Sequence, residues 1–209
     1  MHGRAPSPVS YLPVVAPGGS GNSTGALIRA PRLPRFDEHG NLPPTSSEGA
    51  IRHGHAGFGP SGIAASLTDI HQRFVVEPEG SVRRPRIWDG WMGHRRAMAA
   101  CGVPFVTLVG GSFLTERFEP SDVDLCYLVD GRAIEGADDG TIECLNSVLS
   151  DPEGKDTYLC DINYTTTYPM DHPNFLSMVQ MLTYWSSVFG ISKEGKMRSF
   201  LIVAEQGTL

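Results

Sequence analysis

The sequence predicts an α+β fold in which helices flank a small mixed β-sheet. Short apolar runs rich in valine, typical of buried strands, alternate with longer segments whose apolar residues recur at helical spacing. Helices are predicted first along the chain, and strands and helices then alternate, which suits a single mixed sheet. The chain of 209 residues is long enough for one domain with a sizeable core plus extra arms.

Four segments have the periodicity of helices. The first begins at Ser66, because Ser66-Leu-Thr-Asp69 is a variant of the capping box, and Pro78 ends it. The second spans residues 84–100, and Gly102 stops it. The third covers residues 141–149 and the fourth residues 175–189. The residues expected to face inward in the fourth helix are Phe175, Val179, Leu182 and Phe189.

Four segments are predicted as strands: residues 104–109, 122–129, 156–165 and 200–204. The dipeptide Asp130-Gly131 is expected to end the second of them as a turn. Side chains alternate faces along a strand, so Val123 and Leu125 should point to the core while the aspartates beside them point to the other face.

Glycine and proline divide the chain into three parts. Residues 1–30 are rich in Ser, Gly and Pro and are predicted to be a disordered tail. Residues 31–62 are expected to be an irregular segment that wraps the domain, which itself occupies residues 63–209. Residues 1–100 carry 11 basic and 7 acidic side chains, whereas residues 101–209 carry 6 basic and 16 acidic ones. An acidic half suits a metal cation; the basic arm suits a polyanion or is simply a solvated surface.

The cysteines and the apolar runs indicate in which cellular compartment the protein is expected. Cys101, Cys126, Cys144 and Cys160 form no Cys-x-x-Cys pair and no zinc pattern, so buried, reduced thiols are expected. No signal peptide is evident, and no apolar run is long enough to span a membrane. A soluble, cytoplasmic protein with no membrane partner is therefore predicted.

The most informative motif is a glycine-rich turn followed by two aspartates. Gly110-Gly111-Ser112 ends an apolar strand, and nine residues separate it from Asp122-Val-Asp124. Backbone N–H groups of such a turn can hold phosphates. The two carboxylates lie on one strand face with Cα atoms about 6.6 Å apart, where they repel each other unless a cation such as Mg²⁺ or Mn²⁺ binds between them.

A third carboxylate is expected from a neighbouring strand. Asp161 interrupts a predicted strand, and a lone aspartate in a strand is disfavoured by propensity, so a role as metal ligand or general base is predicted. The structural alternative is an aspartate that bonds to a turn or caps a helix. Asp156 is a weaker candidate.

Several other side chains are candidates for the same ligand. Arg117 lies within the motif, and Lys193, Lys196 and Arg198 precede the last strand, where they could neutralise phosphate charge or remain surface residues. The aromatic pair Tyr184-Trp185 suits base stacking or, at its helical spacing, core packing, and His53-Gly-His55 resembles a metal site without an obvious third ligand.

The segment Gly111-Ser112, nine residues and then Asp122-Val-Asp124-Leu resembles the signature of the DNA polymerase β-like nucleotidyltransferase superfamily. The resemblance implies a minimal nucleotidyltransferase fold. It makes Gly111 and Ser112 the phosphate turn. It makes Asp122, Asp124 and Asp161 the catalytic metal ligands. Gly110, Arg117 and Lys196 stay nucleotide-binding candidates on the strength of their own positions in the sequence.

A closer likeness extends over roughly residues 34–205. Phe36-Asp-Glu-His-Gly-Asn-Leu-Pro-Pro44, Leu67-Thr-Asp-Ile-His-Gln-Arg-Phe74 and Pro120-Ser-Asp-Val-Asp124 look like parts of an uncharacterised bacterial family of small nucleotidyltransferase-like proteins, and Trp185, Phe189, Gly195 and Lys196 fit its C-terminal pattern. The tail at residues 1–30 and a Gly/His/Ser-rich loop between Pro44 and Gly62 depart from it.

The function that the resemblance implies is transfer of NMP from an NTP to a hydroxyl acceptor, with release of pyrophosphate and with Mg²⁺ or Mn²⁺ as cofactor. The acceptor is RNA, a protein or a small molecule. Toxin–antitoxin and phage-defence settings, which would bring a cognate partner protein, are permitted by the resemblance. Two alternatives stay open: an inactive binding or antitoxin module of the same fold, and an oligonucleotide or second-messenger synthase.

Overall fold

The computed structural model describes residues 33–44, 62–150 and 154–204. Its centre is one five-stranded mixed sheet with the strand order β1-β5-β2-β3-β4. The strands are β1 (Gly62–Ala64), β2 (Phe105–Gly110), β3 (Val123–Asp130), β4 (Cys160–Thr167) and β5 (Phe200–Ala204). The β2–β3 and β2–β5 pairs are antiparallel, and the β1–β5 and β3–β4 pairs are parallel. The predicted α+β class with a mixed sheet is confirmed.

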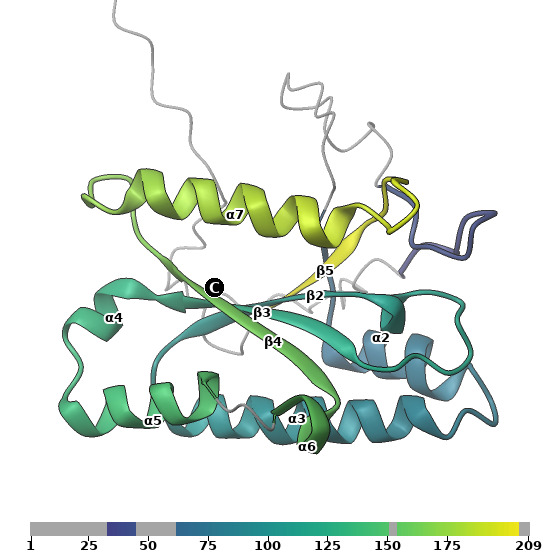
Figure 1. Ribbon diagram of the computed structural model, residues 1–209, viewed down its shortest axis with the longest axis horizontal. Coiled ribbons are helices and arrows are strands. Elements are labelled where there is room, and N and C mark those ends of the chain that lie inside the picture. The colour runs from purple at the N-terminus through teal and green to yellow at the C-terminus, as the bar shows by residue number, and fades with distance from the viewer. Residues whose placement is uncertain (1–32, 45–61, 151–153, 205–209) are drawn as a thin grey trace, which may run out of the picture.

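Helices cover both faces of the sheet. The helix α7 (Phe175–Gly190) crosses one face, and α3 (Arg83–Ala100) and α5 (Asp139–Leu149) lie on the other (Figure 1). Shorter elements complete the fold: α2 (Leu67–His71), the π-helix η1 (Gln72–Val76), the 3₁₀ helix η2 (Ser112–Leu114), α4 (Gly131–Glu135) and α6 (Gly154–Tyr158).

Local signals explain where several helices begin and end. Ser66 caps α2, because its Oγ accepts a hydrogen bond from the Asp69 N–H at 3.1 Å, as the capping-box pattern predicted. Gly102, with φ +75°, follows the end of α3 in the left-handed conformation that glycine adopts most readily. The start of α2 and the end of α3 were therefore readable from the sequence.

The alternation along β3 divides its side chains between two unequal cores. Val123, Leu125, Tyr127 and Val129 point to the α3 face and join a cluster of 20 buried residues. Cys126 points to the α7 face, where the buried cluster has four members, the others being Leu108, Phe189 and Phe200. The predicted inward direction of Val123 and Leu125 is confirmed, since both are fully buried.

Three local predictions were wrong. Asp156 lies on α6, not at the start of a strand, and β4 begins only at Cys160. Asp130 does not open a simple turn: its carboxylate accepts hydrogen bonds from the Arg132 and Ala133 N–H groups and so caps α4. Val179 is 39% exposed, so it belongs to the outer side of α7.

The cysteines differ from the prediction in part. Cys126 and Cys160 are free and buried, as expected. Cys101 and Cys144 are not reduced thiols: they form a disulfide that joins the end of α3 to α5 across a sequence separation of 43 residues. Disulfides persist chiefly in oxidising compartments, so this pair gives no support to the cytoplasmic location expected from the sequence.

Residues 33–44 pack against the rest of the domain, and Leu42 joins its large buried cluster, so this part of the expected wrapping segment also contributes to the core. Asn41 forms an isolated bridge with Thr115, and the Leu42 carbonyl accepts a hydrogen bond from the Ser199 N–H at 2.9 Å. The predicted tail at residues 1–30 and the histidine pair His53/His55 lie outside the described residues. Of the helices in the described part of the chain, none is both long and apolar enough to cross a membrane.

Candidate active site

Sheet register brings three parts of the predicted site together. Gly110 on β2 pairs with Asp124 on β3, and Asp124 pairs in turn with Asp161 on β4. Asp124 is on the same face as Cys126, which is the face covered by α7. Asp124 and Asp161 therefore point to the face covered by α7, directly beside the four-residue buried cluster on that face.

The glycine turn is seated directly on one of these carboxylates. Gly111 has φ +82°, a conformation that side chains rarely adopt, and a Cβ there would overlap the Asp124 carboxylate. Ser112 then opens the 3₁₀ helix η2, and the Thr115 Oγ1 donates a hydrogen bond to the Ser112 carbonyl at 2.8 Å. Close backbone approach explains why glycine is required at position 111.

Buried hydrogen bonds hold the loop between the turn and the aspartates. The Arg84 guanidinium, which is buried in the domain, donates to the backbone carbonyls of Phe113, Thr115 and Arg117, and also to Phe74, at 2.6–2.9 Å. Burial lowers the pKa of Arg84 to about 10. A single buried arginine thus holds three backbone carbonyls of the loop that connects the glycine turn to the aspartates.

Asp124 is a carboxylate of the site whose environment raises its pKa. Its burial, and then the neighbouring charges of Asp122 and Asp161, raise its pKa above the usual range, while Arg198 and Lys155 act in the opposite direction. A buried carboxylate with two carboxylates beside it is stabilised by a cation. This pattern is common at functional sites, where carboxylates are held together against their repulsion.

A lysine that the sequence analysis missed supplies a positive charge. The Lys155 Nζ lies 3.1 Å from Asp122 Oδ2 and 3.0 Å from Asp161 Oδ2. Hydrogen bonds to Asp161 and then to Asp122 raise the pKa of Lys155 to about 12. Within the described residues, no group of three or more His, Cys, Asp or Glu side chains is arranged to hold a metal ion, and the ammonium bridges two of the three expected ligands.

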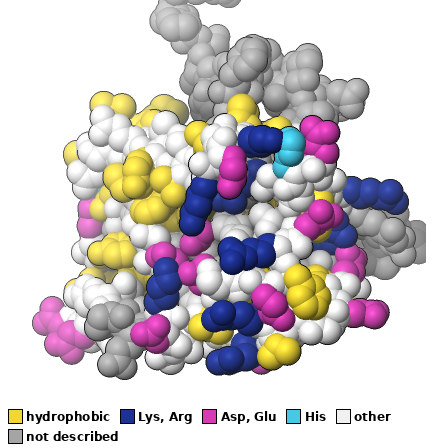
Figure 2. Space-filling view, turned by 45° about the vertical axis from the view of Figure 1, so that its right-hand side comes forward, with side chains coloured by type: hydrophobic (Ala, Val, Ile, Leu, Met, Phe, Trp, Pro, Cys, Tyr) yellow, Lys and Arg dark blue, Asp and Glu magenta, His cyan; other side chains and the backbone are white. Residues whose placement is uncertain are grey.

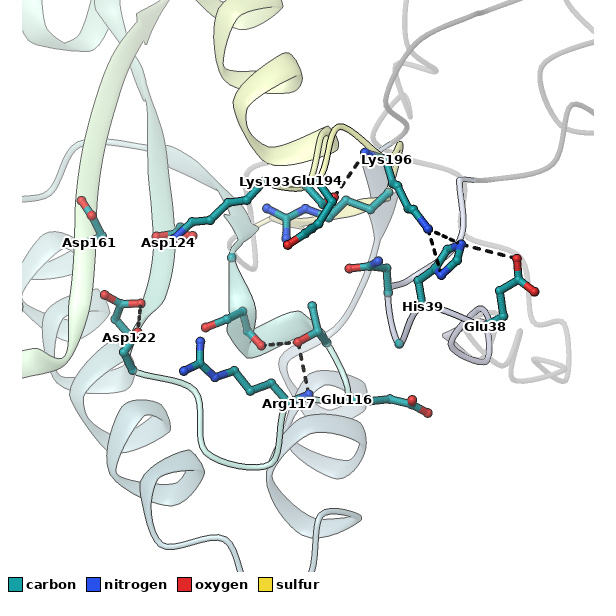
Figure 3. A pocket seen from close by; sticks show the side chains of 18 of the residues that line it. Glu38, His39, Glu116, Arg117, Asp122, Asp124, Asp161, Lys193, Glu194 and Lys196 are labelled. Carbon is teal, nitrogen blue, oxygen red and sulfur yellow. Dashed lines mark hydrogen bonds and ion pairs between the residues drawn. The ribbon is translucent and has the colours of Figure 1, made fainter.

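These groups line one cavity of about 990 Å³. Asp122, Asp124 and Asp161 lie together on one side of it, and Lys196 and His39 lie on the other (Figure 3). The Lys196 Nζ is 2.7 Å from His39 Nε2, so this predicted phosphate-binding lysine is held at the rim, away from the carboxylates. The volume suits a ligand of nucleotide size.

Side chains of both signs line the cavity. Besides the aspartates, the lining includes Gly111, Ser112, Arg117, Lys193, Glu194 and Arg198. On the face shown in Figure 2, basic and acidic side chains are interleaved and do not separate into patches of one sign. Such a surface can neutralise a polyphosphate and its counter-cation at the same time.

Most predicted site residues meet here, and some do not. Gly111, Ser112, Arg117, Asp122, Asp124, Asp161 and Lys196 all line the cavity, together with Lys193 and Arg198. Gly110 belongs to the strand behind it, where a Cβ would press on the Phe189 ring. Trp185 packs against the small α7-face cluster, so core packing, one of its two predicted roles, is the one observed. Asp156 is absent from the lining.

Several lining residues went unassigned in the sequence, and Lys155 and His39 are two of them. Lys155 lies in a hydrophilic segment with no periodic pattern, and nothing local indicated its distant carboxylate partners. His39 belongs to the stretch Phe36–Pro44, whose glycine turn was a signal that could have been followed: Asp37 Oδ1 accepts hydrogen bonds from the His39 and Asn41 N–H groups at 2.9 Å.

Comparison with known proteins identifies the family alone. None of the curated proteins and none of the solved structures compared matches the chain. The profile of a family of unknown function, DUF6932, matches residues 34–204. That range includes every residue of the cavity. The chain therefore belongs to this family of unknown function.

Proposed function

We propose that the protein is a metal-dependent nucleotidyltransferase with a minimal nucleotidyltransferase fold, which transfers NMP from an NTP to a hydroxyl acceptor. One observation carries the proposal. The Gly111-Ser112 turn is packed onto Asp124, and Asp161 is paired beside Asp124 on the next strand. A phosphate-sized anion on the turn would lie next to the carboxylates, where it needs a cation.

The carboxylates suit Mg²⁺ or Mn²⁺. All donors are oxygens, the type that hard divalent cations prefer. The Lys155 ammonium lies between Asp122 and Asp161, and its position marks where these carboxylates stabilise a positive charge. Asp122, Asp124 and Asp161 would hold the metal, which when bound neutralises phosphate charge and orients the reacting groups.

The chain's own residues have separable roles in this reaction. Backbone N–H groups at Gly111 and Ser112 bind the phosphates, and Arg117 and Arg198 neutralise their charge from the cavity wall. Asp161, whose side chain is 46% exposed, is accessible to an incoming hydroxyl group and can accept its proton. The hydroxyl attacks the α-phosphorus in line, and the bond to pyrophosphate breaks.

A label-transfer experiment tests the proposal. The protein is incubated with each of four α-labelled NTPs, with Mg²⁺ or with EDTA, and with cell extract as the source of acceptors. Transfer that requires Mg²⁺ and is lost in Asp124→Asn is expected. The proposal is abandoned if no NTP gives transfer and none shifts the thermal unfolding temperature.

A second candidate is a non-catalytic binding module, and Lys155 is the observation in its favour. A lysine that neutralises two carboxylates makes a metal unnecessary for a stable fold. This candidate predicts that an NTP raises the unfolding temperature equally with Mg²⁺ and with EDTA, and that no label is transferred. A synthase, the other alternative from the sequence, differs by forming product from NTP without extract.

A further inference from the structure

The position of Lys155 is built into the fold. It belongs to α6, which packs against α3 at Gly90, where a Cβ would overlap the Tyr158 carbonyl. Between α6 and β4 the chain passes through Leu159, the one described non-glycine residue with positive φ, at +54°. Strained backbone of this kind is kept where the surrounding structure over-determines it. Here it turns α6 back so that Lys155 reaches Asp161 at the start of β4.

The ammonium takes the place that a divalent cation requires. It contacts one oxygen of Asp122 and one of Asp161, at 3.1 and 3.0 Å. A metal ion bound by the same two carboxylates would lie close to this ammonium, and two cations so close together repel each other strongly. The Lys155 side chain is 57% exposed, so it has free space into which it can move.

We propose that Lys155 is an internal counter-ion that competes with the divalent metal for Asp122 and Asp161, so that the metal binds only when the lysine side chain leaves. This inference rests on the proposed function, since it takes these aspartates as metal ligands. It adds a control on metal binding: before a metal binds, the Lys155 ammonium offsets part of the negative charge of the aspartates, and metal affinity is set by the exchange of one cation for another.

Mn²⁺ binding tests the exchange without any assay of activity. Free Mn²⁺ is titrated by electron paramagnetic resonance against the full chain and against Lys155→Met. Lys155→Met is expected to bind Mn²⁺ on the order of tenfold more tightly, because two partly exposed ion pairs no longer oppose the metal. Lys155→Arg keeps the charge and the contacts and is expected to bind as weakly as the wild type.

Two controls separate local exchange from general electrostatics. Lys193→Met removes an equal charge from the same cavity, but no salt bridge joins Lys193 to these aspartates, so its Mn²⁺ affinity is expected to change by less than about twofold. The double variant Asp122→Asn/Lys155→Met should lose the gain, which places the metal at this site. Thermal unfolding without metal verifies that each variant is folded.

The outcomes distinguish this inference from the proposed function. Equal Mn²⁺ affinity in wild type and Lys155→Met, with binding lost in Asp122→Asn, overturns the exchange and leaves the metal site standing. Equal gains from Lys155→Met and Lys193→Met also overturn it. Absence of Mn²⁺ binding in every variant overturns both the exchange and the metal-dependent reaction.

Discussion

The two faces of the central sheet differ in how completely they are covered. The α3 face has 20 buried residues drawn from helices, strands and the segment at Leu42. The α7 face has four, and α7 carries no charged residue while exposing apolar side chains such as Leu176 and Tyr184. The candidate site lies on the α7 face, where the buried row along β3 changes from Cys126 to Asp124.

This difference indicates that one face stabilises the domain and the other carries the candidate site. A closely packed face can supply the stability of the domain, since burial of apolar area is the main favourable term in folding. A thinly covered face can leave carboxylates close together and open to a ligand, even though their repulsion opposes folding. Substitutions on the α3 face should therefore alter stability, and substitutions near Asp124 should alter function.

The largest expected effect comes from a matched pair of tryptophans. Trp91 on α3 is fully buried, whereas Trp185 on α7 is only partly buried against the small cluster. Trp91→Ala is expected to lower the free energy of unfolding by about 3–5 kcal/mol. Trp185→Ala should cost roughly half as much or less, because fewer atoms surround it. Urea unfolding measures both, and equal losses would contradict the comparison.

Reduction of the disulfide should also act through the α3 face. Cys101–Cys144 closes a loop with a sequence separation of 43 residues. The chain-entropy treatment gives about 4 kcal/mol for a loop of this length. Dithiothreitol should lower the unfolding temperature of the wild type and leave that of Cys101→Ser/Cys144→Ser unchanged. An equal response in both proteins would mean that the bond contributes nothing.

Gly111→Ala should change function more than stability. The added Cβ would displace the Asp124 carboxylate, so the proposed nucleotidyl transfer is expected to fall by about 10- to 100-fold, the scale on which disturbed metal-site geometry acts. Gly102→Ala is the matched control: its φ of +75° imposes the same backbone strain, but nothing lies within 4 Å of its Cβ. Equal losses of activity in the two variants would show that strain alone is responsible.

The smallest expected effects are changes in stability with pH. The raised pKa of Asp124 means that its charge opposes folding above that pKa, and this penalty disappears as the pH falls through it. Asp124→Asn should therefore be more stable than the wild type at pH 7, and the difference should vanish toward pH 4. Mn²⁺ binding should weaken over the same range, since the ligand must be deprotonated.

Glu119, beside the start of α3, differs from Asp124 in that its pKa is lowered and its charge stabilises the fold. Hydrogen bonds from the Val82 N–H, and also from Arg83 and Ser81, hold its pKa below the usual range at the first turn of α3. Its contribution is stabilising above the unfolded-state pKa and is lost as the pH falls through the folded-state value. Glu119→Gln should be less stable than the wild type at neutral pH and equal to it in acid. Thermal unfolding is measured for both proteins between pH 3 and 8. A difference in unfolding temperature that does not change with pH would contradict the stabilising role of the Glu119 charge.

Local patterns were enough to predict most of the sheet and the long helices. The strand at 200–204 was predicted to the residue, and α3 to within one residue at its start, because hydrophobic periodicity and terminating glycines are local properties. The start of β4 was misplaced, since the residues of α6 are too few to show a helical period. β1, with three residues, gave no signal of its own.

Long-range contacts explain what the sequence did not reveal at the site. Asp161 was anticipated as a partner of Asp124 because it interrupts an apolar strand, whereas the register that sets the two side by side became visible only in the structure. Lys155 meets Asp122 only through the left-handed turn at Leu159, which no propensity favours. Likewise His39 and Lys196 are 157 residues apart, and Cys101 and Cys144 are 43 apart. Topology alone brings these pairs together.

The most direct test of the central claim is a crystal structure of the full chain with a nonhydrolysable NTP and Mn²⁺. Phosphates bound by the Gly111-Ser112 turn are expected, with Mn²⁺, located by its anomalous signal, between them and Asp122, Asp124 and Asp161. The Lys155 ammonium should have left the aspartates. A nucleotide bound elsewhere, or one bound in this cavity with Lys155 still in place and no metal, would contradict the account.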